Sequence, residues 1–126
     1  MPELEPVEGL RVVAKPAALD AARWSGDDVD ILRIAQDEVL AIGAFGVKVD
    51  DPDAIVESEA GFAVALLDNE DERALAAHTD WPIPEARGSL AQGKIGGVPA
   101  KLLVGDPSLL VIQIAYADEL RSRLGW

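Results

Sequence analysis

Short apolar runs separated by polar or glycine-containing segments recur along the chain, a pattern that indicates strands. Gln36-Asp37 separates two such runs and predicts a hairpin, and Glu59-Ala60-Gly61 is predicted to join another pair of strands. The predicted strands cover residues 10–14, 30–35, 38–43, 55–58, 62–67, 90–95, 98–104 and 109–115.

Three segments predict helices: residues 16–24, 68–78 and 116–126. The first opens with Pro16, which suits the first turn of a helix. In the second, Asp68 or Asn69 can cap the free N–H groups at the helix start. The third has apolar residues at helical spacing and ends at Gly125, a common C-terminal stop.

This order of strands, helix, strands and helix predicts an α+β fold, with two main helices on one face of a largely antiparallel sheet. Residues 1–9, with Pro2, Pro6 and several glutamates, predict a mobile lead-in. Residues 10–126 are then expected to form a single α+β domain, which is an ordinary size for one domain.

Composition and charge narrow the range of partners. The 126 residues are 49% apolar and 27% charged, as in globular proteins, and the net charge is −12. That charge repels nucleic acid and anionic membranes, and it suits a cationic patch on a larger subunit. The chain has no cysteine, no apolar leader segment and no apolar run near the ~20 residues that span a bilayer. A cytoplasmic protein is expected.

The segment "GKIGG" (93–97) invites comparison with phosphate-binding loops. A Walker loop needs Ser or Thr after the lysine and then a helix, but Ile95 follows Lys94 and a strand comes next. The glycine spacing also differs from that of a dinucleotide-binding loop. Gly96-Gly97 between two apolar runs predicts the tip of a β-hairpin instead, with Gly93 as a bulge or a point of close backbone approach.

Other candidate chemistry is weak. His78 is the only histidine and lies near a predicted helix end, where an imidazolium is favoured without any catalytic role. Acidic clusters lie at residues 27–30, 50–53 and 68–72, but none has the order of a calcium loop. Each falls at a predicted turn or helix start, where Asp is common for backbone reasons. No catalytic, cofactor-binding or metal-binding residue is therefore predicted.

The tryptophans are more suggestive. Trp81 lies in a proline-bracketed loop, and Trp126 is the last residue of the sequence. Aromatic side chains at such places often anchor a partner surface, so these two are candidate interface residues. The alternative, that each caps the edge of the core, has at least the same weight.

Residues 30–126 resemble the sarcosine oxidase gamma subunit family. "LRIAQDEVLAIG" is similar to a hairpin of that family, with Ala35-Gln36 in place of Gly-Pro. "LAQGKIGGVPAKLLVGD" and "LLVIQIAYADELRSRLGW" are similar to its Gln-containing strand, its Val-Pro hairpin partner and its closing helix. The chain departs from the family at Asp68-Asn69, where Gly-Pro is usual, and at Val39, where an aromatic residue is usual.

The resemblance implies the ferredoxin-like core of the folate-binding domain in the glycine-cleavage T-protein (aminomethyltransferase) superfamily. It also implies a non-catalytic accessory subunit, or a stand-alone relative, of a heterotetrameric sarcosine-oxidase-like flavoenzyme of one-carbon metabolism. The partners would be the larger flavoprotein subunits, and this chain would hold no cofactor. A single-domain module that binds a folate-like small molecule is the alternative, a stand-alone enzyme is the third, and homodimerisation stays open.

Overall fold

The computed structural model describes residues 2–126. The chain forms two compact units, one from residues 2–6 and 61–126 and the other from residues 7–60. Each unit has a hydrophobic core of its own.

In the unit of residues 7–60, strands outnumber helices. Its elements are β1 (Glu5–Val13), α1 (Pro16–Asp20), β2 (Arg23–Ser25), β3 (Asp30–Ala35), β4 (Glu38–Ile42), β5 (Gly46–Lys48) and the start of β6 (Ile55–Leu67). The hydrogen-bonded order is β3-β4-β1-β6, while β2 and β5 pair as a separate antiparallel sheet. β4 lies antiparallel between β3 and β1.

The core of this unit lies on one face of the β1–β4 pair. Leu10 and Val12 are buried on either side of the exposed Arg11 in β1, and Val12 lies opposite Val39 of β4. Leu19 of α1 packs on the same cluster. As predicted, α1 begins at Pro16 and β3 and β4 form a hairpin. The helix is shorter than predicted, because Arg23–Ser25 pair with β5 as a strand.

The other unit contains the end of β6 and the C-terminal half of the chain. Its elements are α2 (Asn69–Leu75), a 3-10 turn (Ala76–His78), β7 (Leu90–Ile95), β8 (Val98–Leu103), β9 (Ser108–Gln113), a second 3-10 turn (Ile114–Tyr116) and α3 (Ala117–Leu124). The strands are antiparallel in the order β6-β9-β8-β7. Alternate strand residues form a core with Leu75 of α2 and Leu120 of α3.

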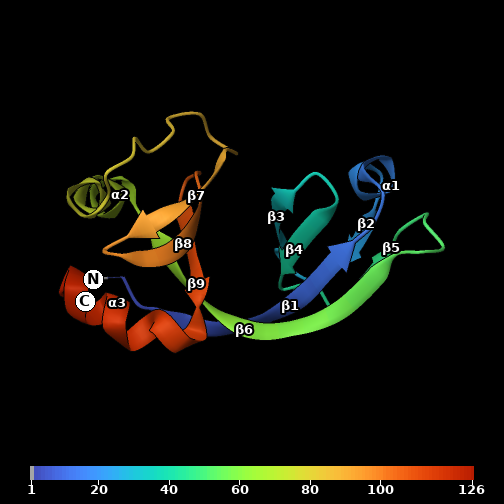
Figure 1. Cartoon of the computed structure of the whole chain (residues 1–126), viewed down its shortest axis with the longest axis horizontal. Helices are drawn as coiled ribbons and strands as arrows, with labels where there is room; N and C mark the ends of the chain where they lie inside the picture. Colours follow the sequence, from blue (N-terminus) through green and yellow to red (C-terminus); the bar gives the residue numbers. More distant parts are fainter. Residues whose placement is uncertain (1) are drawn as a thin grey trace. The chain divides into compact units, whose positions relative to one another are not determined.

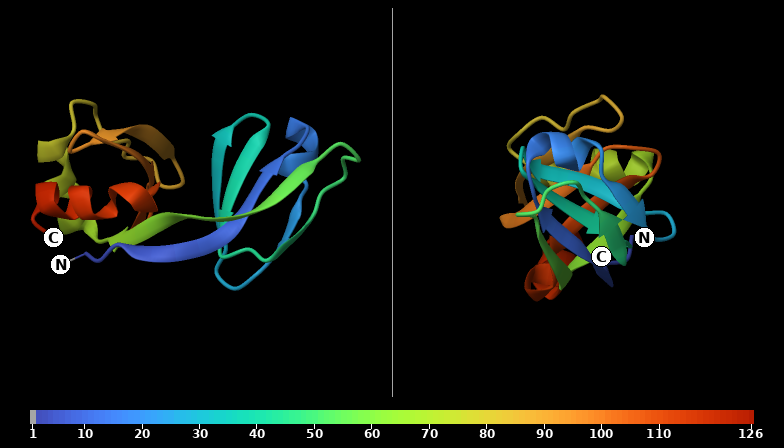
Figure 2. Two further views of the ribbon diagram at one scale, coloured as in Figure 1. Left: turned by 60° about the horizontal axis from the view of Figure 1, so that its bottom comes forward. Right: turned by 90° about the vertical axis from the view of Figure 1, so that its right-hand side faces the viewer.

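β6 is a single strand of 13 residues, drawn as one continuous arrow in Figure 1 and unbroken in the left view of Figure 2. The predicted break at Glu59-Ala60-Gly61 is therefore wrong. Small and acidic residues resemble a turn in sequence, but neighbouring strands hold this segment extended: β1 lies beside β6, and β9 pairs with Phe62–Leu67. Tertiary pairing overrides the local composition here.

The predicted ferredoxin-like α+β fold is wrong. The structure is mostly antiparallel β, with nine strands and three α-helices of only 5, 7 and 8 residues in the described part of the chain. The T-protein-like core that the resemblance implied is therefore wrong as well. The error has a physical cause: which strands pair is a non-local property, and residues 7–60 form a strand-rich core that the order of elements does not reveal. No helix within residues 2–126 is long and apolar enough to cross a membrane.

Candidate functional site

The "GKIGG" segment forms the tip of the β7–β8 hairpin, as predicted. Ile95 lies opposite Val98, and only Gly96 and Gly97 connect the two strands. Both glycines have positive φ, 56° and 79°, which a two-residue turn of this handedness requires.

Backbone groups of this hairpin already have hydrogen-bond partners within the protein. The N–H of Gly96 donates to the carbonyl oxygen of His78 at 2.8 Å, and the guanidinium of Arg123 donates to the carbonyl oxygen of Gly96. The indole Nε1 of Trp81 donates to the carbonyl oxygen of Lys94 at 2.9 Å. These contacts hold the hairpin against the loop of residues 79–89 and against α3, so they give the segment a structural role.

The two tryptophans predicted to face a partner are partly buried. Trp81 and Trp126 both pack against the core of residues 61–126. Trp24 packs in the same way against the core of residues 7–60. This packing fits the alternative that each ring covers a core edge, and an interface role for Trp81 and Trp126 stays a prediction.

The remaining polar residues that were candidates for a functional site take part in backbone hydrogen bonds. His78 is exposed at the end of the first 3-10 turn, where its carbonyl oxygen binds the hairpin. The carboxylate of Asp68 accepts the N–H of Asp71 at 2.8 Å, and the carboxylate of Asp71 accepts the N–H of Asp68, so the two form a capping box. The hydrogen bond from the N–H of Asp71 lowers the pKa of Asp68. Within residues 2–126, no group of three or more acidic or histidine side chains is arranged to hold a metal ion.

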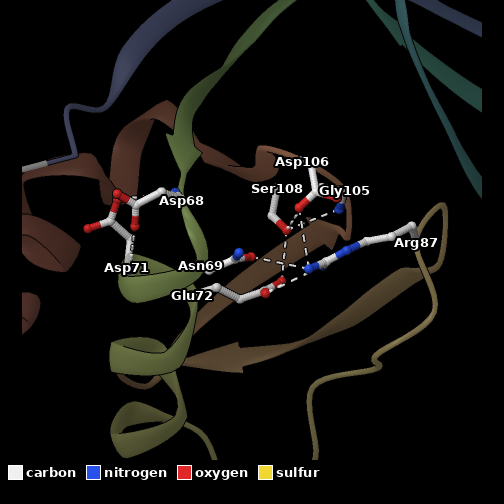
Figure 3. A network of polar contacts seen from close by, with 8 residues as sticks. All are labelled: Asp68, Asn69, Asp71, Glu72, Arg87, Gly105, Asp106 and Ser108. Atoms are coloured by element: carbon white, nitrogen blue, oxygen red, sulfur yellow. Dashed lines mark hydrogen bonds and ion pairs between the residues drawn. The ribbon is translucent and has the colours of Figure 1, made fainter.

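A polar network ties α2 to the turn between β8 and β9 (Figure 3). Ser108 is buried, and its Oγ donates to Oε1 of Glu72 at 2.7 Å. The same Oγ accepts the N–H of Gly105 at 3.1 Å. A substrate has no access to a hydroxyl that is 1% exposed, so the pair positions α2 and does not form a nucleophile and base.

Arg87 completes this network from the loop before β7 (Figure 3). Its guanidinium lies 3.2 Å from the amide oxygen of Asn69, 3.5 Å from Glu72 and 3.4 Å from Asp106. Two carboxylates and an amide oxygen thus surround one cation that is still 43% exposed. Its charge is largely compensated on the α2 side, while the rest of the group faces solvent.

A hollow of about 320 Å³ lies beside this network, between α2 and the loop of residues 83–87. Its charged residues are Glu72, Arg73, Glu85 and Arg87, and its apolar wall includes Ile83 and Pro84. Arg73 forms no ion pair within the described residues. The hollow can therefore offer a guanidinium to a small carboxylate above an apolar wall.

Nothing in the sequence indicates a basic cluster here, but the structure brings Arg73 and Arg87 to one hollow. One arginine lies on a helix and the other in an irregular loop, so no periodicity links them. A second feature was also missed. Large apolar side chains are exposed in residues 7–60, namely Ile31, Phe45, Ile55 and Val56.

The most exposed of these is Phe45, at 79%. Its backbone N–H donates to the carbonyl oxygen of Ser25 at 2.9 Å, so the backbone at this position is fixed while the ring faces solvent. An ordered backbone that presents a bare aromatic ring suits a contact surface, because little backbone entropy is lost on binding.

Comparison with known proteins finds no family model and no curated protein that matches this chain.

Proposed function

We propose that this protein is a non-catalytic, cytoplasmic accessory subunit that docks on the larger flavoprotein subunit of a sarcosine-oxidase-like enzyme. The observation that carries the proposal is the exposure of Phe45, which at 79% is the most exposed large apolar residue of residues 7–60. The resemblance of residues 30–126 to gamma subunits suggests the kind of partner. The fold expected from that resemblance is not the one observed, so the exposed ring of Phe45 has the greater weight.

The charge of the same unit supports docking on a cationic surface. Residues 7–60 contain 12 acidic and 5 basic residues, a formal charge of −7. Scattered apolar residues on a surface are common, but aromatic rings are enriched among residues that anchor interfaces. An exposed aromatic ring on a unit of net negative charge fits a partner with a hydrophobic pocket and a basic rim.

Affinity capture from the source cells tests this proposal. The full chain is expected to retain a larger protein whose eluate shows flavin absorbance, and Phe45→Ser is expected to retain less of it. Ile114→Ser, the same kind of change at a residue that is 42% exposed in the other unit, is the matched control. A chain that purifies alone and crosslinks to no flavoprotein would contradict the proposal.

The hollow beside Arg73 and Arg87 favours a second candidate function, a small-molecule binding module. Folates carry a carboxylate tail and an aromatic ring system, which suit a guanidinium and an apolar wall. Titration of the protein with folate is expected to change tryptophan fluorescence saturably, and Arg73→Ala to weaken the change. Arg23→Ala, a change in the other unit, is the control. A flat response at high folate concentration would remove this candidate.

A further inference from the structure

The first four residues of β6 have an open hydrogen-bonding edge. β9 pairs with β6 only over Phe62–Leu67, and β1 is the other neighbour of β6 in the strand order. Within residues 2–126, no second strand is therefore paired with Ile55–Ser58. The backbone groups on that edge can accept an additional strand.

Both faces of this segment are also exposed. Ile55 and Val56 are 54% and 47% exposed, and Glu57 and Ser58 are exposed as well. Proteins usually protect an open edge with charged side chains, especially lysine, with proline or with a bulge, because bare apolar edges recruit other strands. Ile55–Ser58 contain no lysine or proline, and Glu57 is their only charged residue, so the edge stays open to a strand that carries positive charge.

The charges around the open edge of Ile55–Ser58 determine which kind of strand can pair with it. Residues 50–59 contain five acidic residues and no lysine or arginine. The pKa of Arg11 of β1 is raised mainly by its hydrogen bond to Glu38 and to a smaller extent by the charges of Glu59 and Glu57. Its side chain is therefore already paired with Glu38. Two copies of this acidic strand would place like charges near each other, which disfavours self-pairing. A basic strand is favoured instead.

Strand geometry refines the chemistry of the partner. Successive side chains point to opposite faces, so Ile55, Glu57 and Glu59 share one face, and Val56 and Ser58 share the other. A partner strand with basic residues on the first face and apolar residues on the second would match both.

We infer that Ile55–Ser58 is a strand-addition site, which binds an extended protein segment of alternating basic and apolar residues. The inference rests on the proposed docking function, since it names how the partner is held. Backbone hydrogen bonds would supply affinity, while Glu57 and Val56 would supply specificity.

A synthetic peptide of alternating lysine and valine, added to the full chain, tests the inference directly. Hydrogen–deuterium exchange is expected to slow at residues 55–58, and fluorescence anisotropy of labelled peptide to give saturable binding. A peptide of the same composition with its lysines and valines in two separate blocks is the control for charge alone. Equal binding of both peptides, or no protection of residues 55–58, would overturn the inference.

Variants locate the site. Glu57→Lys and Val56→Ser are each expected to weaken peptide binding by about tenfold or more. Leu66→Ser is the matched control, because Leu66 lies on the same strand and is 62% exposed but belongs to the part paired with β9. Circular dichroism checks folding, and Glu57→Lys changes an exposed side chain that packs in no core. Full binding by both variants would contradict the assignment.

Two further outcomes separate this inference from the proposed function. If Glu57→Lys captures the flavoprotein as well as the unchanged chain does, strand addition is wrong and the accessory role stands. If the alternating peptide binds as expected but no flavoprotein is captured, the site stands and the accessory role is wrong. A dimer in sedimentation that Val56→Ser dissociates would identify a second copy as the occupant and overturn the basic partner.

Discussion

The indole of Trp81 lies directly over Gly93 and donates its N–H to the carbonyl oxygen of the next residue, Lys94, at 2.9 Å. A Cβ built on Gly93 would lie 2.7 Å from the indole nitrogen and 2.8 Å from Cε2 of the ring. Gly93 is therefore the position at which the loop of residues 79–89 docks on β7. In "GKIGG", Gly93 leaves room for the indole of Trp81, and Gly96 and Gly97 form the turn.

Gly93→Ala is expected to destabilise the protein by about 1–3 kcal/mol, the usual cost of inserting a methyl group where no space exists. The ring must move, and its hydrogen bond to the carbonyl oxygen of Lys94 is then strained or lost. The free energy of unfolding in urea, followed by circular dichroism, measures this cost.

A double-mutant cycle provides the control. In a Trp81→Ala background the ring is absent, so the additional Gly93→Ala change is expected to cost clearly less than in the unchanged protein. An equal cost in both backgrounds would show that the glycine is needed for backbone reasons and not for the tryptophan.

Ser108→Ala is expected to cost about 1–3 kcal/mol, because the buried network loses both a donor and an acceptor. The N–H of Gly105 loses the oxygen that it binds at 3.1 Å, and Glu72 loses the donor at 2.7 Å. Urea unfolding of the variant tests the loss. Glu72→Gln keeps an oxygen that can accept from Ser108, so it should cost less, and the reverse ranking would contradict this account.

Local chemistry explains which elements could be predicted from the sequence. The turn at Gly96-Gly97 requires positive φ, and the cap at Asp68 requires an acceptor three residues before an N–H. Both requirements are met by residues within three positions of one another, so the sequence displays them. The exposed start of β6 was also predicted as a strand, since Ile55 and Val56 favour extended backbone.

Non-local pairing explains what could not be predicted. Glu59-Ala60-Gly61 has the composition of a turn, and only its neighbours in the sheet keep it extended. Arg73 and Arg87 meet at one hollow because a helix and a loop pack together, which no spacing encodes. The resemblance to gamma subunits led to the wrong fold for the same reason, since it matched elements and not their pairing.

Asp30→Asn is expected to stabilise the protein near neutral pH. Burial, reinforced by the charge of Asp28, raises the pKa of Asp30 in the folded state. Above that raised pKa the folded protein holds an unfavourable charge, and below the unfolded pKa of about 3.9 both states hold the neutral acid. Relative to the unchanged protein, the variant should therefore gain stability as pH rises through this window. Urea unfolding at about pH 3 and pH 7 measures the gain, and a pH-independent difference would contradict the cause given.

Asp51→Asn is expected to show the opposite dependence. The carboxylate of Asp51 accepts the N–H of Lys15 and the N–H of Asp53, each at 2.9 Å. These two hydrogen bonds, with a smaller contribution from the charge of Lys15, lower the pKa of Asp51. The stabilisation is therefore complete above the unfolded pKa of about 3.9 and is lost as pH falls through the lower folded value.

The variant should be less stable than the unchanged protein at pH 7, and the gap should close in acid as Asp51 becomes protonated. Urea unfolding across this pH range follows the gap. Asp50→Asn is the matched control, because Asp50 is the exposed neighbour of Asp51 and accepts no hydrogen bond within residues 2–126. If the two variants lose stability equally and with the same pH dependence, net charge and not the two hydrogen bonds of Asp51 holds the 50–53 turn against Lys15.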